Sequence, residues 1–201
     1  MTAFPRLFAC LSLVVVVTIA TACHRNTLTD PGAPPPGATL YRSPPLAMDK
    51  VWLAELAGTT PSDTTVTFPA DSGRTIVMRH GPPDNAIFAI VQFTPGSLKP
   101  QSGAMAQVIL RPVPGRVGVE VLTPDAFGVG AYVTISYAVH FQAPSNALAK
   151  FGSAGRFEGM LAAARTLPGG RLQFLKTERP AADMVRFMID ASATYLLATP
   201  R

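Results

Sequence analysis

The stretch Tyr132-Val-Thr-Ile-Ser-Tyr-Ala-Val-His-Phe141 alternates large apolar side chains with smaller or polar ones. In a strand, successive side chains point to opposite faces of the sheet. One face would then carry the large apolar residues Val133, Ile135, Tyr137, Val139 and Phe141, and the other face Thr134, Ser136 and His140. This pattern predicts a central strand with its apolar face covered by a second sheet and its polar face toward solvent.

Further strands are predicted on both sides of this stretch. Apolar or alternating segments occur at 64–68, 74–78, 86–93, 106–110, 117–122, 171–176, 184–189 and 192–198. Turn residues separate them, and Asp71-Ser-Gly73 and Pro168-Gly-Gly170 are typical of hairpins. Strands at this spacing predict an all-β, mainly antiparallel β-sandwich, with a barrel as the alternative.

Two segments have a helical pattern. Met48, Val51, Trp52 and Leu56 recur at helical spacing, with Gly58 just beyond them, and predict one short leading helix over 48–56. Trp52 lies on the apolar stripe of that helix, which favours a core position over stacking on a ligand. Residues 157–167 fit either a helix or a strand, and the Pro168-Gly-Gly170 turn after them favours a strand.

Composition agrees with a turn-rich β protein. Of the 201 residues, 48% are hydrophobic and 14% charged, with 20 Pro and 16 Gly. Such a chain is long enough for one domain with a real core. The formal net charge of +5 is mild. Because the arginines are scattered singly and not interleaved with aromatic residues, the sequence gives no indication of a nucleic-acid partner.

The N-terminal region has the layout of an export signal. Arg6 precedes an apolar run from Leu7 to Ile19, which is shorter than the roughly 20 residues that a membrane-spanning helix needs. Ile19-Ala-Thr-Ala-Cys23 follows, and it resembles the lipobox of bacterial lipoproteins. The resemblance implies a signal peptide over residues 1–22 and a lipid on Cys23. Cleaved secretion without a lipid and an uncleaved N-terminal anchor are the two alternatives.

Cysteine usage supports lipidation. The chain has two cysteines, Cys10 and Cys23, and Cys10 lies in the segment that a signal peptidase would remove. The remaining thiol has no second cysteine with which to form an internal disulfide. A free thiol on an exported protein is open to oxidation, and attachment of a lipid removes that free thiol. We expect a protein anchored by its lipid in the bacterial cell envelope, in the outer membrane in preference to the inner.

A proline-rich tether is expected to follow the anchor. Asp30-Pro-Gly-Ala-Pro-Pro-Pro-Gly37 and Ser43-Pro-Pro45 block regular hydrogen bonding, so residues 23–46 are interpreted as an extended spacer. Residues 47–201 would form the β-sandwich domain with its leading helix.

Three segments of the expected domain resemble ZU5-type β-sandwich modules. They are Phe93-Thr-Pro-Gly-Ser-Leu98, the stretch Val119 to Tyr137 with Pro124-Asp-Ala-Phe127 inside it, and Val185 to Tyr195. The stretch from Phe68 to Ala198 contains all three. This resemblance implies an immunoglobulin-like binding or structural module and transfers no functional residue.

The sequence contains no motif for catalysis, for a cofactor or for a metal. His80 and His140 are candidate catalytic bases, but neither has an acid at a spacing that would orient it, which favours hydrogen-bonded or solvated histidines. Glu178, Asp183 and Asp190 are close in sequence and are the candidates for a cation, although turns and strand ends explain them as well. The preferred function is therefore a non-enzymatic binding or structural module with a protein or glycan partner in the envelope. An envelope hydrolase with dispersed loop residues is the alternative.

Overall fold

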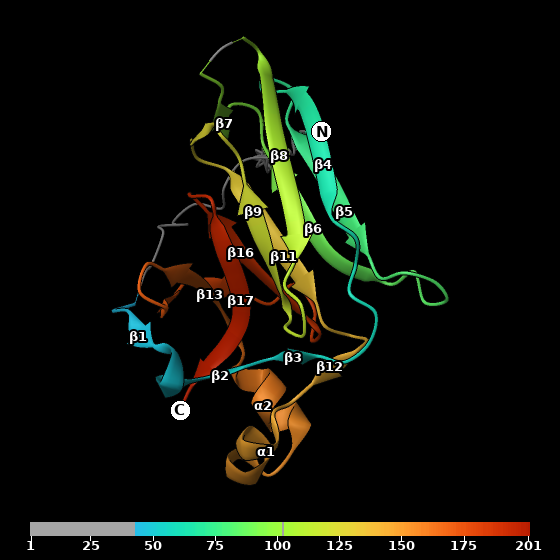
Figure 1. Ribbon diagram of the computed structural model, residues 1–201, viewed down its shortest axis with the longest axis vertical. Coiled ribbons are helices and arrows are strands. Elements are labelled where there is room, and N and C mark those ends of the chain that lie inside the picture. The colour runs from blue at the N-terminus through green and yellow to red at the C-terminus, as the bar shows by residue number, and fades with distance from the viewer. Residues whose placement is uncertain (1–42, 102) are drawn as a thin grey trace, which may run out of the picture. The chain divides into compact units, whose positions relative to one another are not determined.

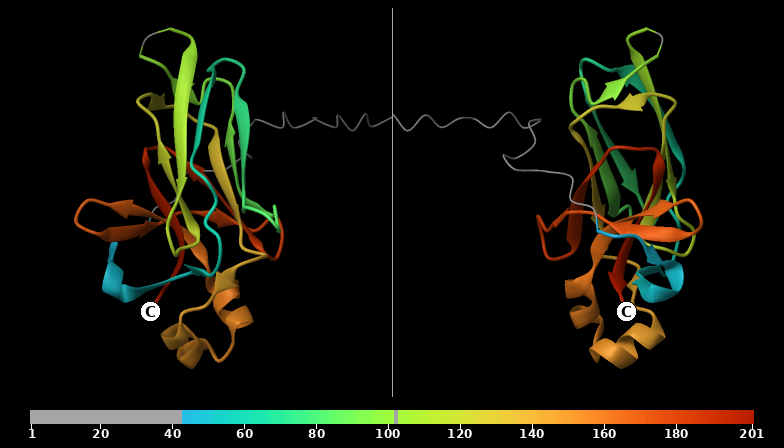
Figure 2. Two further views of the ribbon diagram at one scale, coloured as in Figure 1. Left: turned by 45° about the vertical axis from the view of Figure 1, so that its right-hand side comes forward. Right: turned by 90° about the vertical axis from the view of Figure 1, so that its left-hand side faces the viewer.

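The computed structural model describes residues 43–101 and 103–201. The expected signal peptide, Cys23 and most of the expected tether lie outside the described residues. The described part is an all-β sandwich of antiparallel strands with two short helices, which confirms the predicted fold class. Figures 1 and 2 show the two main sheets facing each other, with the helices at one end.

The larger sheet has the order β1-β14-β13-β17-β9-β8-β4, with β2 paired to β17 beside this path. Its strands are β1 (Leu46–Ala47), β2 (Val51–Leu53), β4 (Thr64–Pro69), β8 (Met105–Pro112), β9 (Gly118–Leu122), β13 (Ala162–Leu167), β14 (Arg171–Phe174) and β17 (Ala193–Pro200). The hairpin predicted at Pro168-Gly-Gly170 is confirmed, because Leu167 pairs with Arg171 across it. The domain start expected at residue 47 falls within β1.

The second sheet has the order β15-β16-β11-β6-β5. Its strands are β5 (Arg74–Arg79), β6 (Ile87–Phe93), β11 (Ala131–Ser136), β15 (Thr177–Glu178) and β16 (Met184–Ile189). Two short ladders complete the domain, β7 (Leu98–Lys99) with β10 (Ala126–Phe127) and β3 (Glu55–Leu56) with β12 (Phe141–Gln142). The strand predicted at the centre, β11, is the middle strand of this sheet, between β16 and β6.

One hydrophobic core lies between the two sheets. Val133 and Ile135 of β11 meet Val119, Val121 and other residues of the larger sheet in a single cluster. Most of these side chains are fully buried. Each large apolar side chain that leaves water in this way contributes about 1.5–3 kcal/mol, so this cluster is the main source of stability.

The inner face of β11 is the predicted one, but two other expectations for this stretch are wrong. Thr134 and Ser136 are on the opposite face as expected, yet they are only 9% and 7% exposed, because β16 and β6 flank them on both sides. The strand also ends at Ser136 and not at Phe141. His140 has a left-handed φ of 60°, which a strand residue does not adopt, and Phe141 begins β12.

The hairpin predicted at Asp71-Ser-Gly73 is wrong as well. The flanking strands belong to different sheets, since β4 pairs with β8 and β5 with β6. The turn therefore connects the two layers of the sandwich. Gly73 has a φ of 67°, and a Cβ atom there would lie 2.6 Å from the carbonyl oxygen of Phe93, so glycine is required for this crossing. A tight turn signal does not distinguish a hairpin from a connection between sheets.

The helix predicted over residues 48–56 does not form. Met48–Lys50 makes a single 3-10 turn, η1, and the chain then extends as β2 and β3. Pairing with the end of β17 explains the difference, because Trp52 lies opposite Thr199 and the backbone groups of β2 find their partners there. Tertiary pairing has overridden the local helical spacing.

Two short helices occupy residues 145–160. The first, α1 (Ser145–Phe151), was not predicted. The second, α2 (Ala154–Met160), begins where the hydroxyl of Ser153 accepts a hydrogen bond from the backbone N–H of Arg156. It takes the first residues of the ambiguous segment 157–167, and β13 takes the rest, so the strand prediction is right only from Ala162 onward.

Candidate functional site

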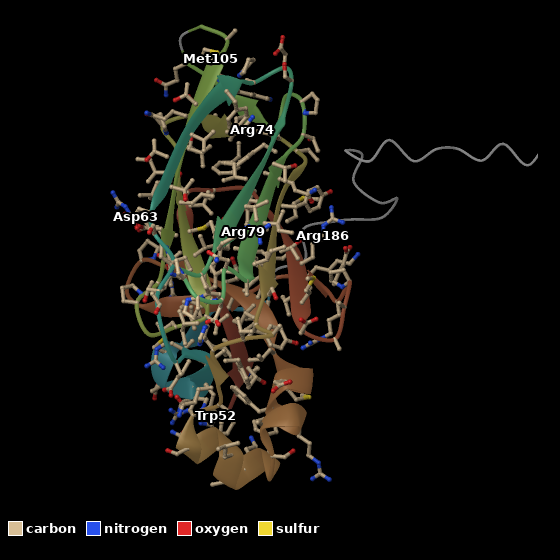
Figure 3. The ribbon with its side chains drawn as sticks, turned by 90° about the vertical axis from the view of Figure 1, so that its right-hand side faces the viewer. Trp52, Asp63, Arg74, Arg79, Met105 and Arg186 are labelled. Atoms are coloured by element: carbon tan, nitrogen blue, oxygen red, sulfur yellow. The ribbon has the colours of Figure 1, made fainter. Side chains whose placement is uncertain are left out.

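A groove of about 340 Å³ lies at the end of the sandwich that carries the helices. Its wall comes from η1, β2, β3, the β8–β9 turn and the start of α1. The lining residues are Met48, Val51, Trp52, Leu53, Glu55, Arg116, Pro144, Ser145, Asn146 and Arg201. Figure 3 shows Trp52 beside the helices. The volume is at the lower end of the range for small-ligand sites.

Trp52 anchors this end of the fold. Its indole is 8% exposed and meets the ring of Phe151 in α1 edge to face, with centroids 5.5 Å apart. The predicted core position is therefore confirmed, although Trp52 fixes α1 and not a helix of its own. Its Nε1–H is buried and has no hydrogen-bond partner among the described residues. A buried donor without a partner is costly to the fold.

Cations outnumber anions around the groove. Arg116 donates to Glu55 through Nη1 at 2.7 Å, and Arg201 donates through Nε to the carbonyl oxygen of Val51 at 3.2 Å. The ammonium of Lys150 lies 4.8 Å from the centre of the Trp52 ring. Of these charged residues, Arg116, Arg201 and Glu55 line the groove, and Lys150 lies beside it on Trp52. Such a site attracts a ligand with negative charge and hydrogen-bond acceptors.

The two candidate histidines lie together, away from the groove lining. Their ring centroids are 4.9 Å apart. Asp84 joins them, because its Oδ2 is 2.6 Å from Nε2 of His140. Asp84 was not predicted as a partner of His140, since Gly81-Pro-Pro-Asp-Asn85 has the composition of a turn and Asp84 lies 56 positions from His140. Only the fold brings them together.

The three candidate acids for a cation do not form a site. Asp190 pairs with Arg165 at 3.2 Å, and Glu178 lies opposite Arg186 in the β15–β16 ladder. The backbone carbonyl of Asp183 accepts a hydrogen bond from the N–H of Tyr137. Across residues 43–101 and 103–201, no three or more His, Cys, Asp or Glu side chains are arranged to hold a metal ion.

The predicted lipid site, Cys23, lies outside the described residues. No helix within the described ranges is both long and apolar enough to cross a membrane. We compared the chain with known protein families, curated proteins and solved structures, and none of them matches it.

Proposed function

We propose that this protein is a lipid-anchored module of the bacterial cell envelope that binds a short acidic glycan in the Trp52 groove. The anchor part of the proposal rests on Ile19-Ala-Thr-Ala-Cys23 and the apolar run before it. The ZU5-like resemblance adds the expectation of a binding module. The observation that carries the ligand part is the groove itself, whose lining combines Arg116 and Arg201 with Glu55 and with the side-chain donors of Ser145 and Asn146.

The size and chemistry of the groove favour a glycan over a protein partner. A volume of about 340 Å³ holds a small ligand or the end of a chain, whereas a protein interface is a broad surface. Asn146, Ser145 and Arg116 supply side-chain donors for hydroxyl and carboxylate oxygens. Lys150, Arg201 and Phe151 pack around the indole of Trp52, so the proposed contacts come from the polar side chains of the lining and not from the indole.

The hydrolase alternative receives less support. It requires a histidine and an acid at a site that substrate can enter. His140 and Asp84 are paired, but the residues that line the groove include neither of them and do not include His80. A non-enzymatic module is therefore the function that the geometry supports best.

Intrinsic fluorescence tests the ligand proposal directly, because Trp52 is the one tryptophan of the chain. Short glycans that carry carboxylate or phosphate groups are titrated against the protein, and neutral glycans of equal length serve as controls. We expect a saturable change with the acidic glycans only. Arg116→Gln should weaken binding, because the variant loses one of the two cations that line the groove.

Arg74→Gln is the matched control. Arg74 is an exposed arginine far from Trp52, toward the other end of the sandwich (Figure 3). It removes the same charge and should leave binding unchanged. An equal loss in both variants would show that the net charge, and not the groove, attracts the ligand. Equal responses to acidic and neutral glycans would reject the proposed ligand class.

A further inference from the structure

Three segments that are far apart in sequence meet at the histidine pair. His80 directly follows β5, Asp84 lies in the β5–β6 connection, and His140 precedes β12. Gly58 and Thr59 follow β3 and complete the surroundings. The backbone holds them in place, since the N–H of Ala57 donates to the carbonyl oxygen of His140 at 2.7 Å.

His80 is buried in a defined tautomer. Its side chain is 2% exposed, and Nδ1 lies 3.1 Å from the carbonyl oxygen of Thr59. A carbonyl oxygen only accepts, so Nδ1 carries the proton and Nε2 carries a lone pair. Within the described ranges Nε2 is buried and has no hydrogen-bond partner. An unsatisfied buried acceptor in a native fold requires an explanation.

His140 has the complementary arrangement. Its Nε2 lies 2.6 Å from the carboxylate of Asp84 and donates to it, which leaves a lone pair on Nδ1 of the neutral ring. Gly58 is the neighbour of that nitrogen, and a Cβ atom at Gly58 would lie 2.6 Å from it. His140 itself has a left-handed φ of 60°, a conformation that is uncommon for residues other than glycine. Such backbone strain is concentrated at functional sites.

We propose that His80 and His140 bind one divalent transition-metal ion through Nε2 and Nδ1. Histidines that bind metals donate their other ring N–H to a carboxylate or a backbone carbonyl. Here His140 does the first and His80 does the second. Two imidazoles that share one ion, with metal–nitrogen bonds of about 2.0–2.1 Å, have centroids about 4.5–5.5 Å apart. The observed separation is 4.9 Å.

The donor set indicates the class of ion. Imidazole nitrogens suit zinc, copper and nickel, whereas calcium and magnesium require oxygen ligands. No third His, Cys, Asp or Glu ligand joins the pair among the described residues, so water would fill the remaining positions. The site departs from the sequence-based expectation of no metal because the fold, and not a spacing motif, joins its ligands.

Zinc and copper titrations of the full-length protein in detergent, without a polyhistidine tag, test this site. We expect one Zn²⁺ per chain to compete with a chromophoric chelator, and the Cu²⁺ form to show electron paramagnetic resonance coupling to two nitrogens. His140→Gln should abolish both signals. Asp84→Asn keeps both ligands and should weaken Zn²⁺ binding by about 10–100-fold, as expected for loss of an orienting carboxylate.

The third histidine of the chain provides the control. His24→Gln should leave binding and the two-nitrogen spectrum unchanged, because His24 is no part of the proposed site. Coupling to one nitrogen or none, or unchanged Zn²⁺ binding in His140→Gln, would overturn the proposal. Far-UV circular dichroism verifies that each variant is folded. If a variant fails to fold, the number of nitrogens coupled to Cu²⁺ in the unmodified protein still tests the proposal.

Discussion

Arg179 donates through Nη1 to the hydroxyl oxygen of Tyr137 at 2.7 Å, and that hydroxyl donates to the carbonyl oxygen of Ala182 at 2.7 Å. The second terminal nitrogen of Arg179 reaches the carbonyl oxygens of Glu158 and Leu161, at the end of α2. The last carbonyls of a helix have no partner within the helix and carry partial negative charge. One guanidinium therefore joins the end of α2 to the residue that follows β11.

We predict that Arg179→Met lowers the free energy of unfolding by about 1.5–3 kcal/mol, the range for a hydrogen bond to a charged group. Methionine keeps most of the aliphatic stem and removes the donors. Arg171→Met is the control, since Arg171 is exposed in β14. Urea denaturation compares the variants. Equal midpoints for both would mean that the Arg179 network contributes nothing measurable.

Ile135→Ala should cost about 2–5 kcal/mol, because Ile135 is fully buried between the sheets and its loss leaves a cavity. Thr134→Ala removes a smaller group from the outer face of the same strand, outside the inter-sheet cluster. Its cost should stay near the 0.5–1.5 kcal/mol or so of a deleted methyl group. Chemical denaturation measures both. A larger cost for Thr134→Ala would contradict the assignment of the two faces.

Period-two patterns predicted the strands well because burial of one face fixes the register. Ile135 and Val133 were assigned to the core on this basis, and they are there. The errors occur where partners distant in sequence decide the conformation. The backbone at Trp52 is extended because β2 pairs with β17. The Asp71-Ser-Gly73 turn crosses between the two sheets because β5 pairs with β6. Neither partner is visible in the local pattern.

The candidate site was less predictable for the same reason. His80 and His140 were identified as candidate catalytic bases, but Asp84 was not, because it lies in a segment with the composition of a turn. The groove depends on Arg116, Arg201 and Asn146, which lie on separate elements and share no motif. Only a prediction of the long-range strand pairing, in particular β2 with β17, would have brought them together.

The stability of the domain should fall above about pH 10 through Tyr132. Burial raises the pKa of Tyr132 above its usual value of 10.0, Arg186 opposes this shift, and Glu178 adds to it. The unfolded chain then loses the proton at a lower pH than the folded chain. Between the two pKa values the folded state binds more protons, so the free energy of unfolding decreases as the pH rises.

Tyr132→Phe isolates this effect. At pH 7 the substitution should be neutral or stabilising, because the hydroxyl is buried and makes no hydrogen bond within the described part of the chain. Urea denaturation at pH 8 and pH 10.5 should show a larger loss of stability for the unmodified protein than for Tyr132→Phe. Every other residue is the same in the two proteins, so its contribution cancels in the comparison. The same loss in both would contradict the role of Tyr132.

Lipidation at Cys23 predicts a specific pattern of labelling. Cells that express the protein with radioactive palmitate should label it, because a lipoprotein carries acyl chains on this cysteine, and several chains give a stable anchor. Cys23→Ser should abolish the label. Cys10→Ser is the matched control and should keep it, since Cys10 lies in the segment expected to be removed. Fractionation of the same cells separates the two alternatives. After plain secretion the protein carries no label and is absent from the membrane fraction. With an uncleaved anchor the protein is in the membrane fraction but carries no label. Persistent labelling of Cys23→Ser would reject the lipoprotein proposal.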